Sequence, residues 1–139
     1  MLFTVTIEPD GRRFDARADE TLLQAARRNG IILPYECGWG SCGTCKVSVL
    51  QGETDLLFAA APAASPRDTR RGRVVACQAR ARSDLTIRLP PGAAPRVSVV
   101  CKEQRAELLA VEELAPDIRR YTFRPDGSAE FQSGQYAIF

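Results

Sequence analysis

Histidine is absent from this sequence of 139 residues. Its absence excludes zinc fingers that combine cysteine with histidine, acid–base catalysis by imidazole, and the Rieske type of iron–sulfur centre, in which two histidines replace two cysteines. Of the metal sites that use sulfur, only those built entirely from cysteine remain.

Membrane helices and charge of one sign are lacking as well. No apolar run approaches the ~18 residues that a membrane-spanning helix needs, and MLFTVTIEPDG at the start contains threonine and glutamate where a secretory signal would stay apolar. The net charge is only +2, which gives no indication of binding to nucleic acid. With 45% hydrophobic and 26% charged residues, we expect a soluble globular protein that works as a monomer in the cytoplasm.

Cysteine is the residue type whose distribution is informative. Three of the five cysteines lie within PYECGWGSCGTCKV, residues 34–47. An odd count and a tight cluster fit poorly with a secreted disulfide framework, whereas reduced thiolates that hold a metal explain both. Three interleaved glycines allow backbone conformations that a β-carbon would forbid, so the loop can wrap closely around a bound group.

The spacing of these cysteines indicates which metal they hold. Four residues separate Cys37 from Cys42, two separate Cys42 from Cys45, and Cys77 is the fourth sulfur that we choose. This is the plant-type arrangement for a 2Fe–2S cluster. Two sulfides bridge the irons, so each iron needs two more sulfurs from the protein. A single loop cannot easily surround the cluster, and we expect a strand elsewhere in the fold to supply the last ligand.

Two other interpretations of the cysteines stay open on the residues alone. A zinc site with four cysteines usually has two short Cys pairs, and here only Cys42 and Cys45 are spaced in that way. A role as small buried residues is disfavoured, because glycines interleaved with cysteines make a poor apolar core. Cys101 lies beyond a proline-rich segment and is interpreted as a plain free thiol.

Hydrophobic periodicity predicts a small α+β domain over residues 1–90. A helix is expected over residues 20–29, with Asp19 as its N-cap and Gly30 as its stop, and a short helix is expected to begin after the N-cap Ser65 and to end near Gly72. The expected strands lie around residues 3–8, 13–17, 46–53, 74–77 and 85–89.

The chain is expected to change character after residue 90. Residues 91–103 have the composition of a linker, because prolines crowd at their start. Strands are then predicted at residues 107–113 and 118–124, on either side of Pro116–Asp117, and again at 131–139. We therefore expect residues 104–139 to be the incomplete N-terminal part of a second domain.

A family resemblance covers residues 2–89. YECGWGSCGTCKV, with VACQ and DLTI downstream, resembles the ferredoxin domain of bacterial oxygenase reductases, and most of all the reductases of monooxygenases that hydroxylate phenols, toluene or alkenes. The resemblance implies a ubiquitin-like β-grasp fold in which Cys37, Cys42, Cys45 and Cys77 are the ligands of the 2Fe–2S cluster.

A second resemblance covers the end of the sequence. FQSGQYAIF at 131–139 is similar to the FxPGQY segment in the first strands of the antiparallel β-barrel that binds FAD in ferredoxin reductases, although Ser133 replaces the proline. The RxYS-type flavin-binding sequence and the glycine-rich nicotinamide site of that family do not occur in these residues. The resemblance thus implies the N-terminal part of a longer reductase.

The function that these resemblances imply is electron transfer. In the implied parent protein, FAD accepts hydride from NAD(P)H, and single electrons then pass through the cluster to an oxygenase or to its ferredoxin. No catalytic residue is expected in these 139 residues, which alone would only carry electrons. The alternatives are a free-standing 2Fe–2S ferredoxin, or the reductase of a Rieske dioxygenase or of a deoxysugar-forming system.

The charge balance of residues 1–90 and the residues beside Cys37 indicate how such a domain binds its partners. Basic residues outnumber acidic ones in residues 1–90, which favours a tethered domain, because diffusing ferredoxins of this type are commonly acidic. Trp39 and Tyr35 flank the first ligand, and each either belongs to a docking patch or covers the core. Glu36 is interpreted as an ordinary solvated charge.

Overall fold

The computed structural model describes residues 1–92 and 104–128. The chain divides into two compact units, Met1–Lys102 and Glu103–Phe139. The strand predicted at 131–139 and nearly all of the linker predicted at 91–103 lie outside the described residues. Among the residues that the structure does describe, no helix is long and apolar enough to cross a membrane.

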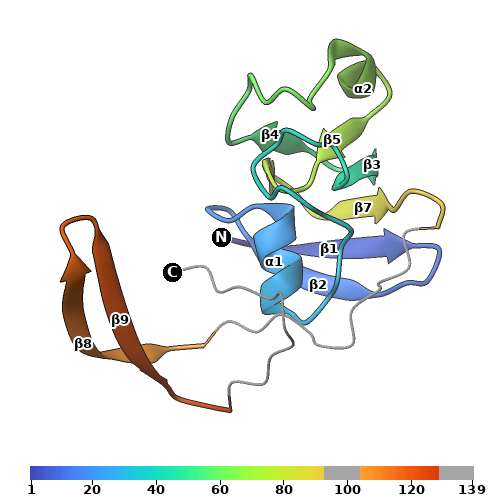
Figure 1. The fold of residues 1–139 in the computed structure, drawn as a ribbon. Coiled ribbons are helices and arrows are strands. Elements are labelled where there is room, and N and C mark those ends of the chain that lie inside the picture. The colour runs from blue at the N-terminus through green and yellow to red at the C-terminus, as the bar shows by residue number, and fades with distance from the viewer. Residues whose placement is uncertain (93–103, 129–139) are drawn as a thin grey trace. The chain divides into compact units, whose positions relative to one another are not determined.

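The first unit is built on a mixed sheet in the order β2-β1-β7-β3-β5 (Figure 1). β1 (Leu2–Glu8) forms an antiparallel hairpin with β2 (Arg13–Arg17) and pairs in parallel with β7 (Leu85–Arg88). β3 (Lys46–Gln51) pairs antiparallel with both β7 and β5 (Arg73–Val75). The predicted α+β class is confirmed, with a single longer helix, α1 (Leu22–Arg28), packed on the sheet.

A second, two-stranded sheet escaped prediction. β4 (Thr54–Leu56) pairs antiparallel with β6 (Ala79–Ala81), and each strand has only three residues, too few for an alternating pattern to stand out. The Asp55 carboxylate receives two hydrogen bonds from Arg80 across this pair. The strand predicted at residues 74–77 is only partly right, because it ends at Val75 and the following residues turn toward β6.

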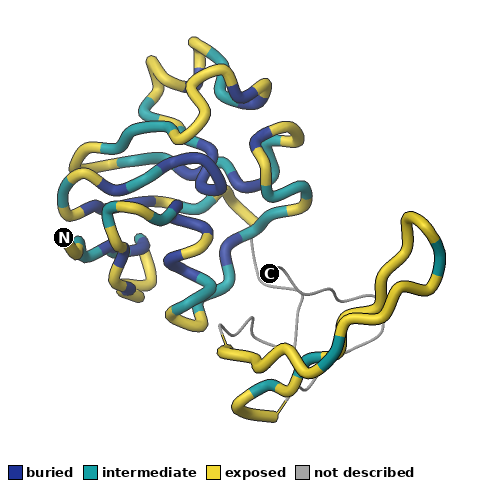
Figure 2. The backbone as a smooth tube through the Cα atoms, turned by 90° about the vertical axis from the view of Figure 1, so that its left-hand side faces the viewer, coloured by how far each residue is buried: buried dark blue, intermediate teal, exposed yellow. Residues whose placement is uncertain are grey.

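The core lies between the sheet and α1, as the dark segments of Figure 2 show. The predicted apolar face of the helix is confirmed, since Leu22, Leu23 and Ala26 are buried. Large side chains of this kind stabilise a fold by about 1.5–3 kcal/mol each when fully buried. The largest fully buried side chains on the strands are those of Val5, Ile7, Val47, Val75 and Ile87.

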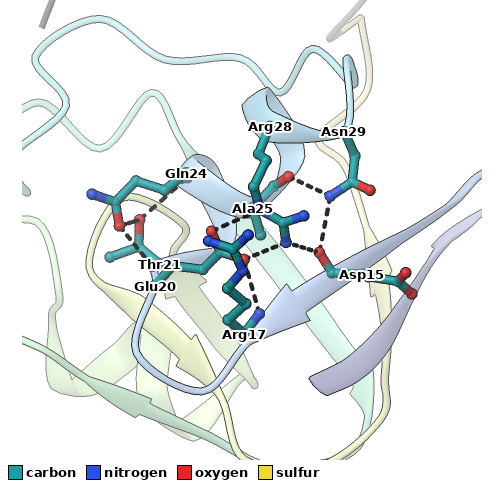
Figure 3. A network of polar contacts seen from close by, with 8 residues as sticks. All are labelled: Asp15, Arg17, Glu20, Thr21, Gln24, Ala25, Arg28 and Asn29. Carbon is teal, nitrogen blue, oxygen red and sulfur yellow. Dashed lines mark hydrogen bonds and ion pairs between the residues drawn. The ribbon is translucent and has the colours of Figure 1, made fainter. Parts of the chain in front are cut away.

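The N-cap of α1 differs from the prediction. Thr21 caps the helix, and Asp19 does not. The Thr21 hydroxyl accepts a hydrogen bond from the Gln24 amide at 3.3 Å, while the Gln24 side chain accepts one from the Thr21 amide at 2.9 Å (Figure 3). A capping box needs an acceptor side chain three residues after the cap, and the residue three positions after Asp19 is Leu22.

The other end of α1 is fastened to β2. Gly30 ends the helix as predicted, and its amide donates to the Arg27 carbonyl at 3.0 Å. Arg28 and Asn29 both donate to the Asp15 carbonyl, at 2.8 and 2.9 Å, and Arg28 also forms an ion pair with Glu20 (Figure 3). These contacts fix the helix on the sheet.

The second unit, as far as it is described, is a β-hairpin. The two predicted strands are confirmed as β8 (Ala106–Ala115) and β9 (Ile118–Pro125), which pair antiparallel around a turn at Pro116–Asp117. Most of its length is exposed, as the yellow colour in Figure 2 shows. Exposed large apolar side chains line it: Leu108, Leu109, Val111, Leu114, Ile118 and Tyr121.

Replacement of Thr21 by alanine should lower the free energy of unfolding by about 1 kcal/mol, the usual cost of losing an N-cap hydroxyl. Urea denaturation of the cluster-loaded protein, followed by circular dichroism, measures this difference. Thr21→Ser is the matched control, because it keeps the hydroxyl and should cost less. An equal loss in the two variants would show that the threonine methyl group matters and the cap does not.

Candidate metal centre

Three of the predicted ligands lie in the cysteine loop, residues 34–45, which connects α1 to β3 and is teal in Figure 1. The first residue of β3 follows Cys45 directly, so the sheet fixes that end of the loop. Cys77 lies in the turn between β5 and β6, which corrects the prediction that it sits on a strand. Two hydrogen bonds hold the turn, because the Ala76 amide donates to the Cys45 carbonyl and the Ala76 carbonyl accepts from the Leu23 amide, both at 3.0 Å.

The four thiols are grouped in two pairs at different depths. The Sγ atoms of Cys45 and Cys77 lie 3.3 Å apart, and both residues are buried. Cys37 is half-buried and Cys42 is exposed, with the Cys42 amide 3.5 Å from the Cys37 sulfur. The structure thus brings all four predicted residues into one region. Cys101 lies outside the described residues.

The protein environment acts in opposite directions on two of these thiols. The amide of Cys42 first, and then that of Trp39, lowers the pKa of Cys37 to about 6, so this sulfur is mostly thiolate at neutral pH. Burial first, and then the neighbouring Cys45 thiol, raises the pKa of Cys77 to about 12. A bound metal ion overrides such a penalty, because it deprotonates a coordinating thiol outright.

Gly40 allows the cysteine loop to pack tightly on the next segment of the chain. Its φ is +94°, and a β-carbon there would lie 3.0 Å from both the Ala61 β-carbon and the Gln78 Cγ atom. Its carbonyl accepts a hydrogen bond from the Ala63 amide at 2.9 Å. A glycine is needed where the backbone has both a left-handed conformation and so close a neighbour.

The short helix α2 (Pro66–Arg70) also supports the end of the loop that leads into β3. Ser65 is its N-cap, as predicted. Lys46, which follows Cys45, forms an ion pair with Asp68 at 2.9 Å. Hydrogen bonds from Ser65 and then from Lys46 hold the pKa of Asp68 below its ordinary value, so this carboxylate stays charged at neutral pH.

The arrangement of donors fits two metal ions better than one. A mononuclear zinc site gathers four thiolates around one ion, whereas a 2Fe–2S cluster takes two thiolates on each iron. An inner and an outer pair of thiols therefore fit the binuclear cluster.

A helix packed on a mixed sheet, with a glycine-rich cysteine loop at the start of one strand, defines a ferredoxin-type β-grasp domain. Residues 5–82 match the model of the 2Fe-2S iron-sulfur cluster binding domain, and the chain belongs to that family. The predicted cofactor class and the predicted family are both confirmed.

Known relatives extend the match beyond the ferredoxin domain. The reductase component of phenol 2-monooxygenase from Pseudomonas sp. (strain CF600) is 37% identical over 137 residues, which are 98% of this chain and 39% of that protein. The ferredoxin–NAD(+) reductase component of the alkene monooxygenase system of Xanthobacter autotrophicus is 38% identical, over 93% of this chain and 39% of that protein.

A solved structure also matches this chain beyond the ferredoxin domain. The crystal structure of an Amycolatopsis cytochrome P450 reductase superposes with a TM-score of 0.76 at 36% identity, covering 96% of this chain and 39% of that one. The chain therefore spans about two fifths of the length of the relatives that it matches.

Tyr35 and Trp39, the two aromatic residues near Cys37, differ in how far they are exposed. Tyr35 packs partly buried against the core, with the Arg27 guanidinium carbon 4.0 Å from its ring centroid, which favours a structural role. Trp39 is 61% exposed and Glu36 is exposed as predicted.

Sequence reasoning missed the contacts of Gly40 with Ala61 and Gln78, because no local pattern marks them.

We expect Gly40→Ala to reduce cluster content, because the added methyl group would force apart the loop and its neighbours. Gly38→Ala is the matched control, since its φ of +74° gives similar backbone strain but no atom lies within 4 Å of the new carbon. Visible absorption per mole of purified protein is the measurement. Equal loss in the two variants would mean that backbone strain, and not the close packing at Gly40, limits cluster binding.

Proposed function

We propose that this chain is the ferredoxin part of an NAD(P)H-dependent flavin and iron–sulfur reductase that supplies single electrons to an oxygenase component. The observation that carries the proposal is the pairing of the thiols, buried at Cys45 and Cys77 and outward at Cys37 and Cys42. Such a depth difference gives a centre that is protected on one side and reachable by a partner on the other.

Each cysteine has a distinct part in this proposal. Cys45 and Cys77 would share the inner iron, because their sulfurs are already adjacent, and Cys37 and Cys42 would share the outer iron. A bound 2Fe–2S cluster takes up and releases one electron at a time. Amides of the loop offset negative charge on the Cys37 sulfur, and burial of the inner pair excludes water from that side.

We assign residues 1–90 to the ferredoxin domain, 91–103 to a linker and 104–139 to the beginning of an FAD-binding domain. The exposed apolar side chains of the β8–β9 hairpin support this division. A two-stranded hairpin is marginally stable by itself in water and needs further strands or a helix to cover its apolar side chains. In the full-length reductase, FAD and NAD(P)H would be bound by these further parts.

The partner in this proposal is an oxygenase that hydroxylates aromatic compounds or alkenes, or a ferredoxin that serves it. Support comes from the names of the relatives, which are reductase components of phenol and alkene monooxygenases. The reductase would work in the cytoplasm, where NAD(P)H is available and thiols remain reduced.

Analysis of the full-length protein tests the proposal. After anaerobic reconstitution, we expect two irons and two acid-labile sulfides per chain, bound flavin, and bleaching of the visible absorption by NAD(P)H. Protein that retains zinc, or that contains neither iron nor labile sulfide after proper reconstitution, would refute it. A cluster that NAD(P)H reduces only when a separate reductase is added would identify a free-standing carrier.

Replacement of Cys77 by serine should abolish most of the visible absorption, because the inner iron would lose one of its two thiolates. It should also lower stability, since binding of the cluster contributes to the free energy of folding. Cys101→Ser is the control and should leave the spectrum unchanged. If Cys77→Ser kept a normal spectrum while Cys101→Ser bleached it, the fourth ligand would have to be reassigned to Cys101.

A further inference from the structure

Three large apolar side chains are exposed around the cysteine loop. Trp39 belongs to the loop itself and is 61% exposed, while Leu57 and Phe58, which follow β4, are 59% and 49% exposed. We call these three residues the apolar rim. Aromatic residues with this degree of exposure are enriched where proteins bind other proteins.

Backbone contacts place the members of the apolar rim beside one another. The Leu57 amide donates to the Gln78 carbonyl at 2.7 Å, so this residue lies next to the turn that carries Cys77. The Phe58 carbonyl accepts from the Ala61 amide at 3.1 Å. Ala61 in turn lies against Gly40, the residue that follows Trp39. The apolar rim therefore lies on the cysteine loop and on the segment after β4 that contacts both this loop and the turn of Cys77.

Basic side chains extend this surface at α2. Arg67, Arg70 and Arg71 are all exposed, and we call them the arginine cluster. In the part of the chain that the structure describes, none of the three takes part in an ion pair, and the nearby Asp68 is paired with Lys46. That ion pair and the hydrogen bond from Ala63 to Gly40 attach α2 and the segment before it to the cysteine loop.

We propose that the apolar rim and the arginine cluster form one docking surface for the protein that accepts the electron, and that this protein presents an acidic face with an apolar centre. The inference rests on the proposed function and adds the chemistry of the partner. Unpaired arginines attract carboxylates and speed the encounter, and the apolar rim, Trp39 above all, supplies the contacts that hold the complex.

The position of the surface suits electron transfer. Cys42, the most exposed of the four cysteines, lies in the same loop as Trp39. A partner seated on the apolar rim would exclude water from the outer thiol pair and bring its own acceptor close to it. The opposite edge of the sheet, formed by β2, also carries exposed arginines, Arg13 and Arg17, but none of the four cysteines lies in that strand.

Charge substitutions in the full-length reductase test the electrostatic half of this proposal. The probe is an oxygenase component that the wild-type reductase reduces, and the measurement is its rate of reduction by NAD(P)H at increasing ionic strength. Arg67→Gln/Arg70→Gln should lower the apparent second-order rate constant about fivefold at low salt and flatten its salt dependence. Arg13→Gln/Arg17→Gln removes the same charge from β2, at the other edge of the sheet, and should change neither.

Replacement of Trp39 by alanine tests the apolar half. We expect the KM for the oxygenase component to rise about tenfold, with Trp39→Phe recovering most of the loss and with unchanged visible absorption in both variants. Reduction of the cluster by NAD(P)H without oxygenase is followed in parallel by stopped-flow absorbance. If Trp39→Ala slows only that internal step, the reductase's own flavin domain covers the apolar rim, and the proposal is wrong.

The remaining outcomes separate this proposal from the proposed function. Wild-type reductase that reduces the oxygenase, together with variants that match it at every salt concentration, would overturn the docking surface alone. Wild-type protein that NAD(P)H fails to reduce would overturn the reductase assignment itself. Equal slowing by the α2 and β2 substitutions would show a general effect of net charge and would also overturn the docking surface.

Discussion

The contact between the buried thiols of Cys45 and Cys77 constrains the rest of this domain. Burial penalises negative charge on sulfur, and the pKa of Cys77 is raised for that reason. Two thiolates 3.3 Å apart would also repel each other. The pair is therefore most stable when a cation lies between the sulfurs. The β3–β5 pairing of Lys46 with Val75 brings the two chain segments together, so the sheet has to be complete for the inner half of the centre to form.

The outer half of the centre is organised by different forces. Cys37 is stabilised as a thiolate by backbone amides of its own loop, which requires the loop to turn sharply and not to be buried. Gly40 provides close packing on one side of the loop, and Lys46 with Asp68 provides an ion pair on the other. The loop thus presents an ionisable, accessible pair of sulfurs and is held in its middle at Gly40 and at its β3 end by Lys46.

Local sequence signals were sufficient for much of this structure. Alternating residues in β1, the N-cap at Ser65 and the helix stop at Gly30 each depend on neighbours close in sequence, and these elements were predicted correctly. The spacing of the cysteines directed attention to the four residues that the fold brings together. Long-range effects were missed. The place of Cys77 in a turn depends on the β4–β6 pairing, whose short strands have no pattern of their own.

One hydrogen bond described above links the helix to the cysteine turn, from the amide of Leu23 to the carbonyl of Ala76. That amide belongs to the first turn of α1 and so has no carbonyl partner within the helix, and the turn beside Cys77 supplies one. The start of α1 and the turn that presents Cys77 are consequently parts of one cooperative unit. Fraying of the helix would expose the inner sulfurs to solvent and oxidants, and in the loaded domain protection from amide hydrogen exchange should extend from the metal into the helix.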